Sequence, residues 1–337
     1  MNILLAPLEG ITTYVYRNAL NKYYGGIDCY YTPFLTATHL KGREKRDVLP
    51  ANNPELNLVP QILTNEPETF LCIADQLAEL GYKKVNLNLG CPSGTVISKK
   101  RGAGFLTEPK SLYDFLDKVL NNLNGIELSL KTRIGFEFLS EWEDLLDIYK
   151  SFPLSEIIIH PRLRNELYAG NVHIEEFQKA FERIPDSTNI IYNGDITSIK
   201  SLTQVINAIR EVSPDYPERH DFSVMVGRGI IRNPELAKVL KDYTASSAED
   251  VSPEDDISAA NRPLVDPKIS DMNTFRKFMN EIMENYITEM SNEKHVVMKM
   301  KELWIYFAEG LSLDKKLLKE ILKTSRLPEY KSIVQMI

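Results

Sequence analysis

Three side chains with useful chemistry follow short apolar segments of the chain: Cys91, Lys131 and His160. Cys91 stands between Gly90, which lets the backbone approach a ligand closely, and Pro92, which stiffens the turn. Lys131 offers a cation that would stabilise an electron-rich ring or a developing anion. His160 can serve as a base, a hydrogen-bond donor or a metal ligand. Together these residue types indicate an active site.

The sequence favours neither a metal site nor a disulfide framework. It contains 3 cysteines without CxxC spacing, and no second His or acidic residue stands at a short ligand spacing from His160. Cys29 and Cys72 fall in a predicted strand and a predicted helix, which is typical of buried, inert thiols. We therefore expect no metal, and we expect Cys91 to be the reactive cysteine.

Eight short apolar segments recur along the first 240 residues, and each precedes a stretch with helical periodicity. Their starts are 25 to 33 residues apart, except for one step of 43. This spacing matches one strand plus one helix and predicts an α/β fold, a TIM-type (β/α)8 barrel. The expected strands are 3–6, 28–32, 56–63, 84–89, 127–132, 156–160, 189–193 and 222–226.

Barrel enzymes carry their chemistry at the carboxyl ends of the strands, so the residues at these ends are the candidate site. They are Pro7, Leu8, Glu9, Gln61, Asn88, Cys91, Lys131, Arg133, His160, Arg162, Asn193, Gly194, Asp195, Gly227 and Arg228. The glycine turns after the last two strands would expose backbone N–H groups at helix starts, which predicts a phosphate site. The alternative, that these glycines only form tight turns, stays open.

The longest step between strands leaves room for a loop, residues 91–109, at the same end. Lys99, Lys100 and Arg101 precede the Gly102-Ala103-Gly104 sequence in this loop. Two interpretations apply: a mobile lid over the site, or a solvated loop face.

Helical periodicity lapses between residues 243 and 267, where Asp, Glu and Pro indicate a solvated linker. Helices are expected at 272–290, 293–309 and 314–325. We divide the chain into a catalytic barrel (1–243), an acidic, proline-containing linker (244–267) and a small all-helical C-terminal domain (268–337). The last segment carries 12 Lys and Arg against 10 Asp and Glu, in a chain whose net charge is -7. The overall negative charge disfavours a nucleic-acid partner, but it does not exclude a local basic face there.

No apolar run reaches the roughly 18 to 20 residues of a membrane span, and no basic segment of a signal peptide precedes the first apolar residues. We expect a soluble, cytoplasmic protein that does not bind membranes.

Taken in order, the motifs resemble those of the tRNA-dihydrouridine synthase family over residues 3–240. They are Ala6-Pro7-Leu8-Glu9-Gly10-Ile11-Thr12, Asn88-Leu89-Gly90-Cys91-Pro92-Ser93, Gly102-Ala103-Gly104-Phe105-Leu106, Lys131-Thr132-Arg133, His160-Pro161-Arg162, Asn193-Gly194-Asp195-Ile196 and Val226-Gly227-Arg228-Gly229. The helical segment adds only a compatible architecture.

The resemblance implies an FMN-dependent enzyme that reduces specific uridines of tRNA to 5,6-dihydrouridine, with NADPH or NADH as the reductant. Hydride would pass from flavin N5 to C6 of the uracil, and Cys91 would donate the proton to C5. Asn88, Arg133 and Arg162 would contact the target base, and residues 268–337 would bind tRNA. FMN would be held by Pro7, Leu8, Glu9, Gln61, Lys131, His160, Asn193, Gly194, Asp195, Gly227 and Arg228.

Three positions depart from the family pattern. Leu8 stands where Met is usual, Pro161 where Gly is common, and Thr32-Pro33-Phe34 lacks an acidic residue often found before that Phe. None removes a catalytic group. Pro161 removes a backbone donor and fixes φ, so we expect the contacts of His160 or Arg162 to differ in detail.

Three functions are open at this point. The first is the tRNA-modifying flavoenzyme. The second is an FMN-dependent barrel oxidoreductase acting on a free pyrimidine or another small molecule, as dihydroorotate and dihydropyrimidine dehydrogenases do, which needs no helical domain. The third is a tRNA-binding module with an inactive barrel, which does not need Cys91, Lys131 and His160. The sequence leaves open which uridine is reduced, which nicotinamide is used, and whether the protein is a monomer.

Overall fold

The structure is a computed structural model that describes residues 1–214, 222–249 and 268–337. Within these residues, nine parallel strands form one nearly closed barrel, which confirms the predicted fold class. Their order in the sheet is β3-β2-β1-β9-β8-β7-β6-β5-β4. The strands are β1 (Asn2–Leu5), β2 (Cys29–Tyr31), β3 (Leu58–Val59), β4 (Gln61–Ile62), β5 (Lys84–Leu89), β6 (Glu127–Arg133), β7 (Glu156–His160), β8 (Asn189–Tyr192) and β9 (Ser223–Val226).

The predicted third strand is divided at Pro60 into β3 and β4, so eight expected strands become nine. Pro60 has no N–H to donate to a neighbouring strand, but its carbonyl accepts from Asn86 N at 2.9 Å. β3 pairs with β2, and β4 pairs with β5 through Gln61 and Asn86. The two halves of one strand therefore bridge the sheet edges and complete the ring.

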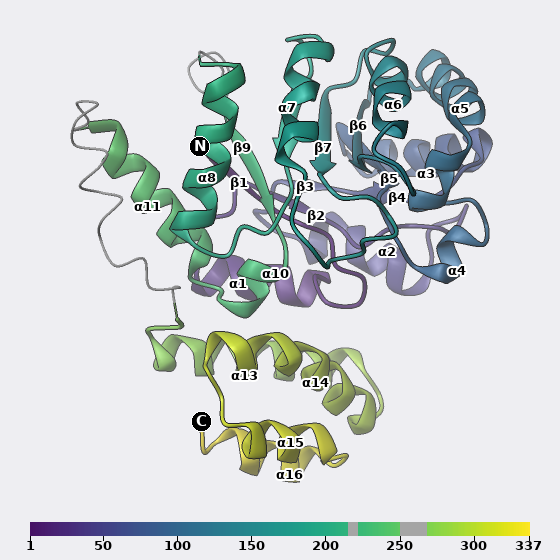
Figure 1. The fold of residues 1–337 in the computed structure, drawn as a ribbon. Coiled ribbons are helices and arrows are strands. Elements are labelled where there is room, and N and C mark those ends of the chain that lie inside the picture. The colour runs from purple at the N-terminus through teal and green to yellow at the C-terminus, as the bar shows by residue number, and fades with distance from the viewer. Residues whose placement is uncertain (215–221, 250–267) are drawn as a thin grey trace. The chain divides into compact units, whose positions relative to one another are not determined.

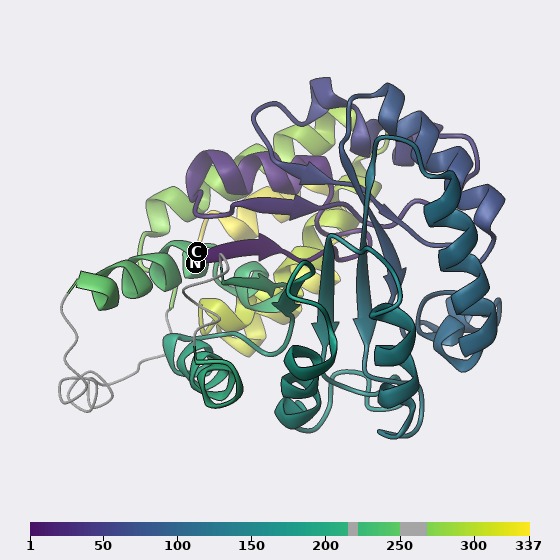
Figure 2. The same cartoon turned by 90° about the horizontal axis from the view of Figure 1, so that it is seen from above.

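Helices cover the outer face of the strands (Figures 1 and 2). α5 buries Leu112, Phe115, Leu116 and Val119, the spacing of a single helical face. Neighbouring helices of this layer pack on one another. The main ones are α3 (Pro67–Glu79), α5 (Pro109–Asn122), α6 (Glu141–Tyr149), α7 (Ile174–Arg183) and α8 (Ile199–Val212), and shorter ones are α2 (Gly42–Val48), η1 (Pro50–Asn52), α4 (Gly94–Ile97) and η2 (Gly102–Thr107).

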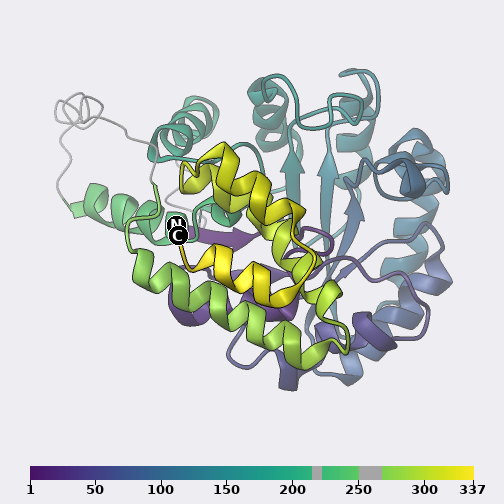
Figure 3. The same cartoon turned by 90° about the horizontal axis from the view of Figure 1, so that it is seen from below.

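The described chain splits into two compact units. The first holds all the strands and comprises residues 1–7, 28–195 and 203–226. The second comprises residues 8–27, 196–202 and 227–337. Its helices are α1 (Tyr14–Tyr23), α10 (Arg228–Arg232), α11 (Leu236–Glu249), α13 (Met272–Glu289), α14 (Glu293–Gly310), α15 (Lys315–Lys323) and α16 (Leu327–Val334). The three predicted C-terminal helices are α13, α14 and α15, whereas α16 was not expected (Figure 3).

Aromatic packing explains why α1 belongs to the second unit. Phe278 of α13 contacts Tyr16 edge-on at 5.7 Å between ring centroids and Tyr24 at 5.3 Å. The Phe307 ring of α14 lies 6.1 Å from the Phe278 ring, measured between centroids. The Trp304 indole nitrogen donates to the Tyr330 hydroxyl at 2.7 Å. The C-terminal helices thus share one core with α1.

The predicted boundary after residue 243 falls within a helix. α11 runs to Glu249, so helical backbone continues through the first residues assigned to the linker. The rest of that segment, residues 250–267, lies outside the described residues. The compact units also follow side-chain packing rather than this boundary, because residues 8–27 and 227–249 group with the C-terminal helices.

A close approach between two helices generates a stability prediction. A Cβ on Gly310 at the end of α14 would lie 1.8 Å from the Arg232 carbonyl oxygen of α10. Alanine normally favours a helix over glycine by about 1 kcal/mol. Here the overlap must push the helices apart, so we expect Gly310→Ala to lower the free energy of unfolding by about 1–3 kcal/mol in urea denaturation.

Gly94→Ala is the matched control, since a Cβ there meets nothing within 4 Å. Its free energy of unfolding should stay within about 0.5 kcal/mol of the wild type. Equal stability of the two variants would show that α10 and α14 do not meet as described.

Candidate active site at the carboxyl ends of the strands

Strand register brings most of the predicted site residues together in the first unit. Asn88 pairs with Lys131 across β5 and β6, and Arg133 pairs with His160 across β6 and β7. Gln61 lies in β4 beside Asn86. The same unit also holds Pro7 after β1, Cys91 after β5, Arg162 after β7, and Asn193, Gly194 and Asp195 after β8.

Four of the predicted residues belong to the second unit. Leu8 and Glu9 follow β1 in the chain, and Gly227 and Arg228 follow β9. Leu8 N donates to Thr12 Oγ1 at 2.8 Å and so forms a tight turn. Gly227 precedes the first residue of α10, and its carbonyl accepts from Ile230 N at 3.1 Å.

The turn that carries Cys91 is held from both sides. Asn88 Oδ1 accepts from Gly90 N at 3.0 Å and from Cys91 N at 2.9 Å. Ala103 N donates to the Cys91 carbonyl at 3.1 Å. Gly102 has φ +56°, and a Cβ there would lie 2.9 Å from the Cys91 carbonyl oxygen, so only glycine fits. The half-buried Cys91 is therefore fixed in position through its backbone.

The segment after Cys91 is packed rather than open. Ala103, Phe105 and Leu106 of η2 are buried, and the Phe105 ring meets Phe115 edge-on at 5.5 Å. Lys100 pairs with Glu108, and Arg101 Nε donates to Asn65 Oδ1 at 3.2 Å. These contacts favour a folded wall of the site over the mobile lid considered from the sequence.

Lys131 places a poorly compensated cation next to the Cys91 turn. Desolvation, with a smaller contribution from the charge of Arg133, lowers the pKa of Lys131 to about 7, while Cys91 acts in the opposite direction. This half-buried ammonium beside a guanidinium lacks a matching anion. An anionic or electron-rich group at this position would be stabilised by Lys131.

Arg133 connects the Cys91 turn to the loop after β7. Its side chain is 1% exposed. Nε donates to the Gly90 carbonyl at 3.0 Å, and the two terminal nitrogens donate to the carbonyls of Leu163 at 2.9 Å and Leu167 at 2.8 Å. All three nitrogens of the guanidinium are therefore bound to backbone.

Arg162 connects His160 to the end of β8. It is 1% exposed, and it donates to Gly170 O at 2.7 Å and to Asp195 Oδ2 at 2.5 Å. Its other terminal nitrogen lies 3.3 Å from His160 Nε2. Because a guanidinium can only donate, His160 Nε2 must accept, and we assign the ring proton to Nδ1.

The predicted contact of Arg133 and Arg162 with a target base rests on the resemblance to the family and stays a prediction. Both side chains are 1% exposed, and their hydrogen bonds hold the Cys91 turn and His160 in position.

Sequence reasoning missed Tyr168, which lies in the loop after β7. The Tyr168 ring is 53% exposed, stacks on His160 at 6.1 Å between centroids, and lies 5.5 Å from the Arg133 guanidinium carbon. An aromatic side chain exposed beside buried cations offers a flat surface for a ligand ring. Its position shortly after the His160-Pro161-Arg162 motif was the available signal.

The turn after β8 favours the tight-turn interpretation for Gly194. A Cβ there would lie 2.1 Å from the Tyr192 hydroxyl, so a side chain does not fit. Asn193 Nδ2 donates to Met225 O at 2.8 Å, which ties this turn to β9. The predicted phosphate site at these turns stays a prediction.

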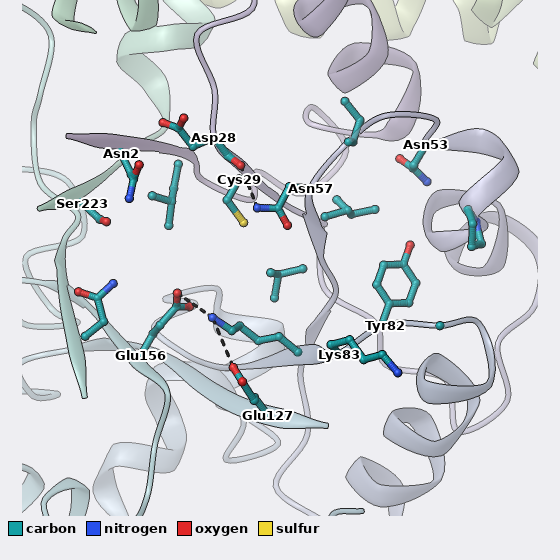
Figure 4. A pocket seen from close by; sticks show the side chains of 18 of the residues that line it. Asn2, Asp28, Cys29, Asn53, Asn57, Tyr82, Lys83, Glu127, Glu156 and Ser223 are labelled. Carbon is teal, nitrogen blue, oxygen red and sulfur yellow. Dashed lines mark hydrogen bonds and ion pairs between the residues drawn. The ribbon is translucent and has the colours of Figure 1, made fainter. Parts of the chain in front are cut away.

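A separate cavity of about 710 Å³ lies at the opposite ends of the strands (Figure 4). Glu156 is paired in this cavity: Lys84 Nζ lies 2.9 Å from Glu156 Oε1, and the Tyr31 hydroxyl donates to Glu156 Oε2 at 2.9 Å. Burial raises the pKa of Cys29 in this cavity to about 12, which keeps the thiol protonated. These features are typical of the stabilising end of a barrel and agree with an inert Cys29.

Neither a metal centre nor a membrane segment emerges from the described residues. No group of three or more His, Cys, Asp and Glu among them could hold a metal ion. No helix in the described ranges is long and apolar enough to cross a membrane.

Comparison with known proteins decides the family. Residues 4–321 match the model of the family described as dihydrouridine synthase (Dus). The chain belongs to the dihydrouridine synthase family. This family comprises flavin-dependent oxidoreductases that use FMN. The match covers all of the motifs on which the resemblance rested.

Individual relatives agree with the family assignment. A probable tRNA-dihydrouridine synthase of Staphylococcus aureus (strain COL) is 28% identical over 257 residues, which cover 74% of each chain. Probable tRNA-dihydrouridine synthase 2 of Bacillus subtilis (strain 168) is 28% identical over 239 residues, covering 68% of this chain and 69% of that protein. Among solved structures, a putative dihydrodipicolinate synthase family protein from Coccidioides immitis aligns over 99% of this chain and 92% of its own chain. The TM-score is 0.48 and the sequence identity is 10%.

The donor set of the first unit suits the FMN of this family. Gln61 brings a fully buried amide, Lys131 an uncompensated cation and His160 an Nδ1–H donor. A flavin ring presents carbonyl oxygens and ring nitrogens that accept from such groups, and its reduced form is electron-rich.

Lys131 gives a pH-dependent stability prediction for the flavin-free protein. Its pKa is lowered on folding, so the unfolded chain binds the proton more tightly and the wild type gains stability between about pH 7 and pH 10.5. Lys131→Met removes the buried ammonium and should raise the free energy of unfolding at pH 6.5 by on the order of 2 kcal/mol, with little difference at pH 10.5. Thermal unfolding at both pH values measures this.

Lys150→Met, at an exposed lysine, is the control and should not reproduce the pH-dependent gain. A wild type that is less stable at pH 9 than at pH 6.5, with the same slope in Lys131→Met, would contradict the assigned burial of Lys131.

Proposed function

We propose that this protein reduces specific uridines of tRNA to 5,6-dihydrouridine in the cytoplasm, with FMN as the cofactor and NADPH or NADH as the reductant. The single observation that carries the proposal is the Cys91 turn, whose backbone is held by Asn88 beside Lys131. The names of the relatives and the family match support the same reaction.

Bound FMN would supply a hydride from N5 to C6 of the uracil ring. The Cys91 thiol would donate a proton to C5, because hydride addition leaves negative charge on the ring that one proton neutralises. Asn88 and Arg133 hold the Cys91 turn through Gly90. Lys131 would stabilise negative charge within the site until that proton is transferred.

FMN would be held by residues from the ends of several strands. Gln61, Lys131 and His160 would face the ring, and Arg162 would keep His160 in its Nδ1–H form. Of the remaining residues assigned to the cofactor, Asn193, Gly194, Asp195, Gly227 and Arg228 would serve the phosphate, and Pro7, Leu8 and Glu9 would line the site.

Tyr168 and Asn88 would receive the uridine. The exposed Tyr168 ring is suited to stack on an unstacked base, and stacking of this kind contributes about 1–3 kcal/mol per base. A base removed from folded RNA needs such contacts, since unstacking costs a few kcal/mol.

The segment 268–337 is proposed to bind tRNA mainly through α15. Lys315, Lys316, Lys319 and Lys323 are exposed on this helix. In the described part of the chain none of the four takes part in an ion pair. Lys299 of α14 points inward instead, since it donates to Gly10 O at 3.2 Å and pairs with Glu302 at 2.7 Å.

The alternative of a free small-molecule substrate is not retained. The family match extends from the barrel through α14 and most of α15, so it includes helices that a small-molecule dehydrogenase would not need. The inactive-barrel alternative is not retained either, because Cys91, Lys131 and His160 are all present at the strand ends.

The central test replaces the proton donor. Cys91→Ala should keep flavin reduction by NADPH or NADH but lose dihydrouridine formation in tRNA by about 10²- to 10⁴-fold, as expected for a positioned general acid. Mass-spectrometric nucleoside analysis measures the product. Cys29→Ala and Cys72→Ala are the controls and should remain active. If Cys91→Ala formed dihydrouridine at the wild-type rate, the proposed role of this thiol would be wrong.

A second test concerns α15. Changing Lys315, Lys316, Lys319 and Lys323 together to Gln should weaken tRNA binding and flatten its salt dependence, because each lost phosphate contact removes about 0.7–0.9 from the slope of log K against log salt. FMN content should not change. Filter binding at several salt concentrations gives the slope.

The matched control removes four exposed positive charges from the barrel unit, at Lys83, Lys118, Lys150 and Arg210. Lys83 precedes β5. Lys118, Lys150 and Arg210 lie near the C-terminal ends of α5, α6 and α8. If this control and the α15 variant reduce binding equally, the RNA contact is nonspecific and α15 is not its site.

A further inference from the structure

A chain of buried amide groups runs through the barrel interior to the Cys91 turn. Gln61, Asn86 and Ser129 are 0% exposed and Asn88 is 8% exposed. They come from three neighbouring strands, and Asn86 is the register partner of both Gln61 and Ser129. Alternate residues of β5, such as Leu87, face the other side of the strand. These polar side chains therefore form one inward-facing layer.

The hydrogen bonds of this layer have only one possible direction. Asn88 Oδ1 already accepts two backbone N–H groups, so its Nδ2 must donate, and it does so to Gln61 Oε1 at 2.7 Å. Gln61 Nε2 must then donate, and it bonds Asn86 Oδ1 at 2.8 Å. Asn86 Nδ2 donates to Ser129 Oγ at 2.9 Å, and Ser129 donates to Val85 O at 3.1 Å.

Each amide in this chain is oriented by its neighbour. A 180° flip of any one of them would bring two donors or two acceptors together in a water-free interior, where an unpaired polar group is costly. Asn86 is central because it lies between Gln61 and Ser129 and has no access to the mouth of the site. Its oxygen fixes the orientation of Gln61, and Gln61 in turn fixes Asn88.

We propose that Asn86 is a positioning residue: it sets the orientation of the Gln61 and Asn88 amides and thereby the place of the Cys91 thiol. The consequence for catalysis rests on the proposed function of Cys91, whereas the placement of the thiol does not. Asn86 touches no reacting atom. The requirement is for an acceptor facing Gln61, not for an amide as such.

Two substitutions of similar shape separate orientation from packing. Asn86→Leu removes the acceptor, so Gln61 and Asn88 can turn and loosen the backbone of Gly90 and Cys91. Asn86→Asp keeps an oxygen toward Gln61, and the Ser129 hydroxyl can rotate to donate to its second oxygen. The positioning role predicts a defect in the first variant and rescue in the second.

The first measurement is alkylation of Cys91 by iodoacetamide at pH 7.5 in the purified full-length protein carrying Cys29→Ala and Cys72→Ala. Lys131 stabilises the thiolate of a thiol held beside it, so displacement of the turn should slow the reaction. We expect Asn86→Leu to react about fivefold more slowly than the parent and Asn86→Asp to stay within about twofold of it.

The second measurement is dihydrouridine formation in tRNA under steady-state conditions. Asn86→Leu should lower kcat by about 10- to 100-fold with an unchanged KM for tRNA, because misplacement of a reacting group by about 1 Å has effects of this size. Ser129→Ala, which frees only the far end of the chain, should show a smaller loss and serves if Asn86→Leu does not fold.

The proposal would be overturned if Asn86→Leu and Asn86→Asp were equally impaired. It would also be overturned if Cys91 reacted with iodoacetamide at the rate of the parent protein in both Asn86→Leu and Ser129→Ala. Failure of the proposed function would look different: the parent protein would make no dihydrouridine, while the alkylation rates would still separate the Leu variant from the Asp variant.

Discussion

A parallel strand can join a closed barrel only if both of its edges find partners, and here the third strand must reach two neighbours across a proline. The Pro60 carbonyl turns to β5, where it accepts from Asn86 N, while Val59 O accepts from Thr32 N on the other side. One residue later, Gln61 N donates to Thr32 Oγ1 and Gln61 O accepts from Leu35 N. This arrangement places the Gln61 side chain in the same layer as Asn86. The polar interior and the ordered Cys91 turn both depend on it.

The electrostatic character of the site follows from what the barrel encloses. Arg133 and Arg162 are buried and Lys131 is half-buried, but only the two arginines are supplied with acceptors, mostly backbone carbonyls and Asp195. Lys131 is the member of this group whose pKa falls to about 7. The two guanidinium groups therefore make structural hydrogen bonds, whereas the Lys131 ammonium is available to a ligand.

Sequence patterns were sufficient for the strands and for placing the candidate residues at or after strand ends. β5 and β7 begin and end at the residues predicted for them, 84–89 and 156–160, and each is buried on both faces. The break at Pro60 followed from the missing N–H, which a hydropathy pattern does not register. α16 was missed because it is only 8 residues long and Pro328 stands in its first turn.

The orientation of side chains was the part that the sequence could not supply. Arg133 and Arg162 matched the expected positions, yet their directions depend on carbonyl groups 30 and 34 residues away in the first case and on Asp195 in the second. Asn86 and Ser129 look like ordinary strand residues until the register places them beside Gln61. Contacts of this kind arise from closure of the barrel, not from local pattern.

The shared core of α1 and α13 limits how this protein can be divided or recombined. Tyr16, Tyr24 and Phe278 cover one another, although more than 250 residues separate the first from the last along the chain. A shortened chain ending at Glu249 would leave the aromatic face of α1 open to solvent and prone to self-association. Exchange of C-terminal helices between relatives, in nature or in the laboratory, therefore has to carry compatible residues at positions 16 and 24.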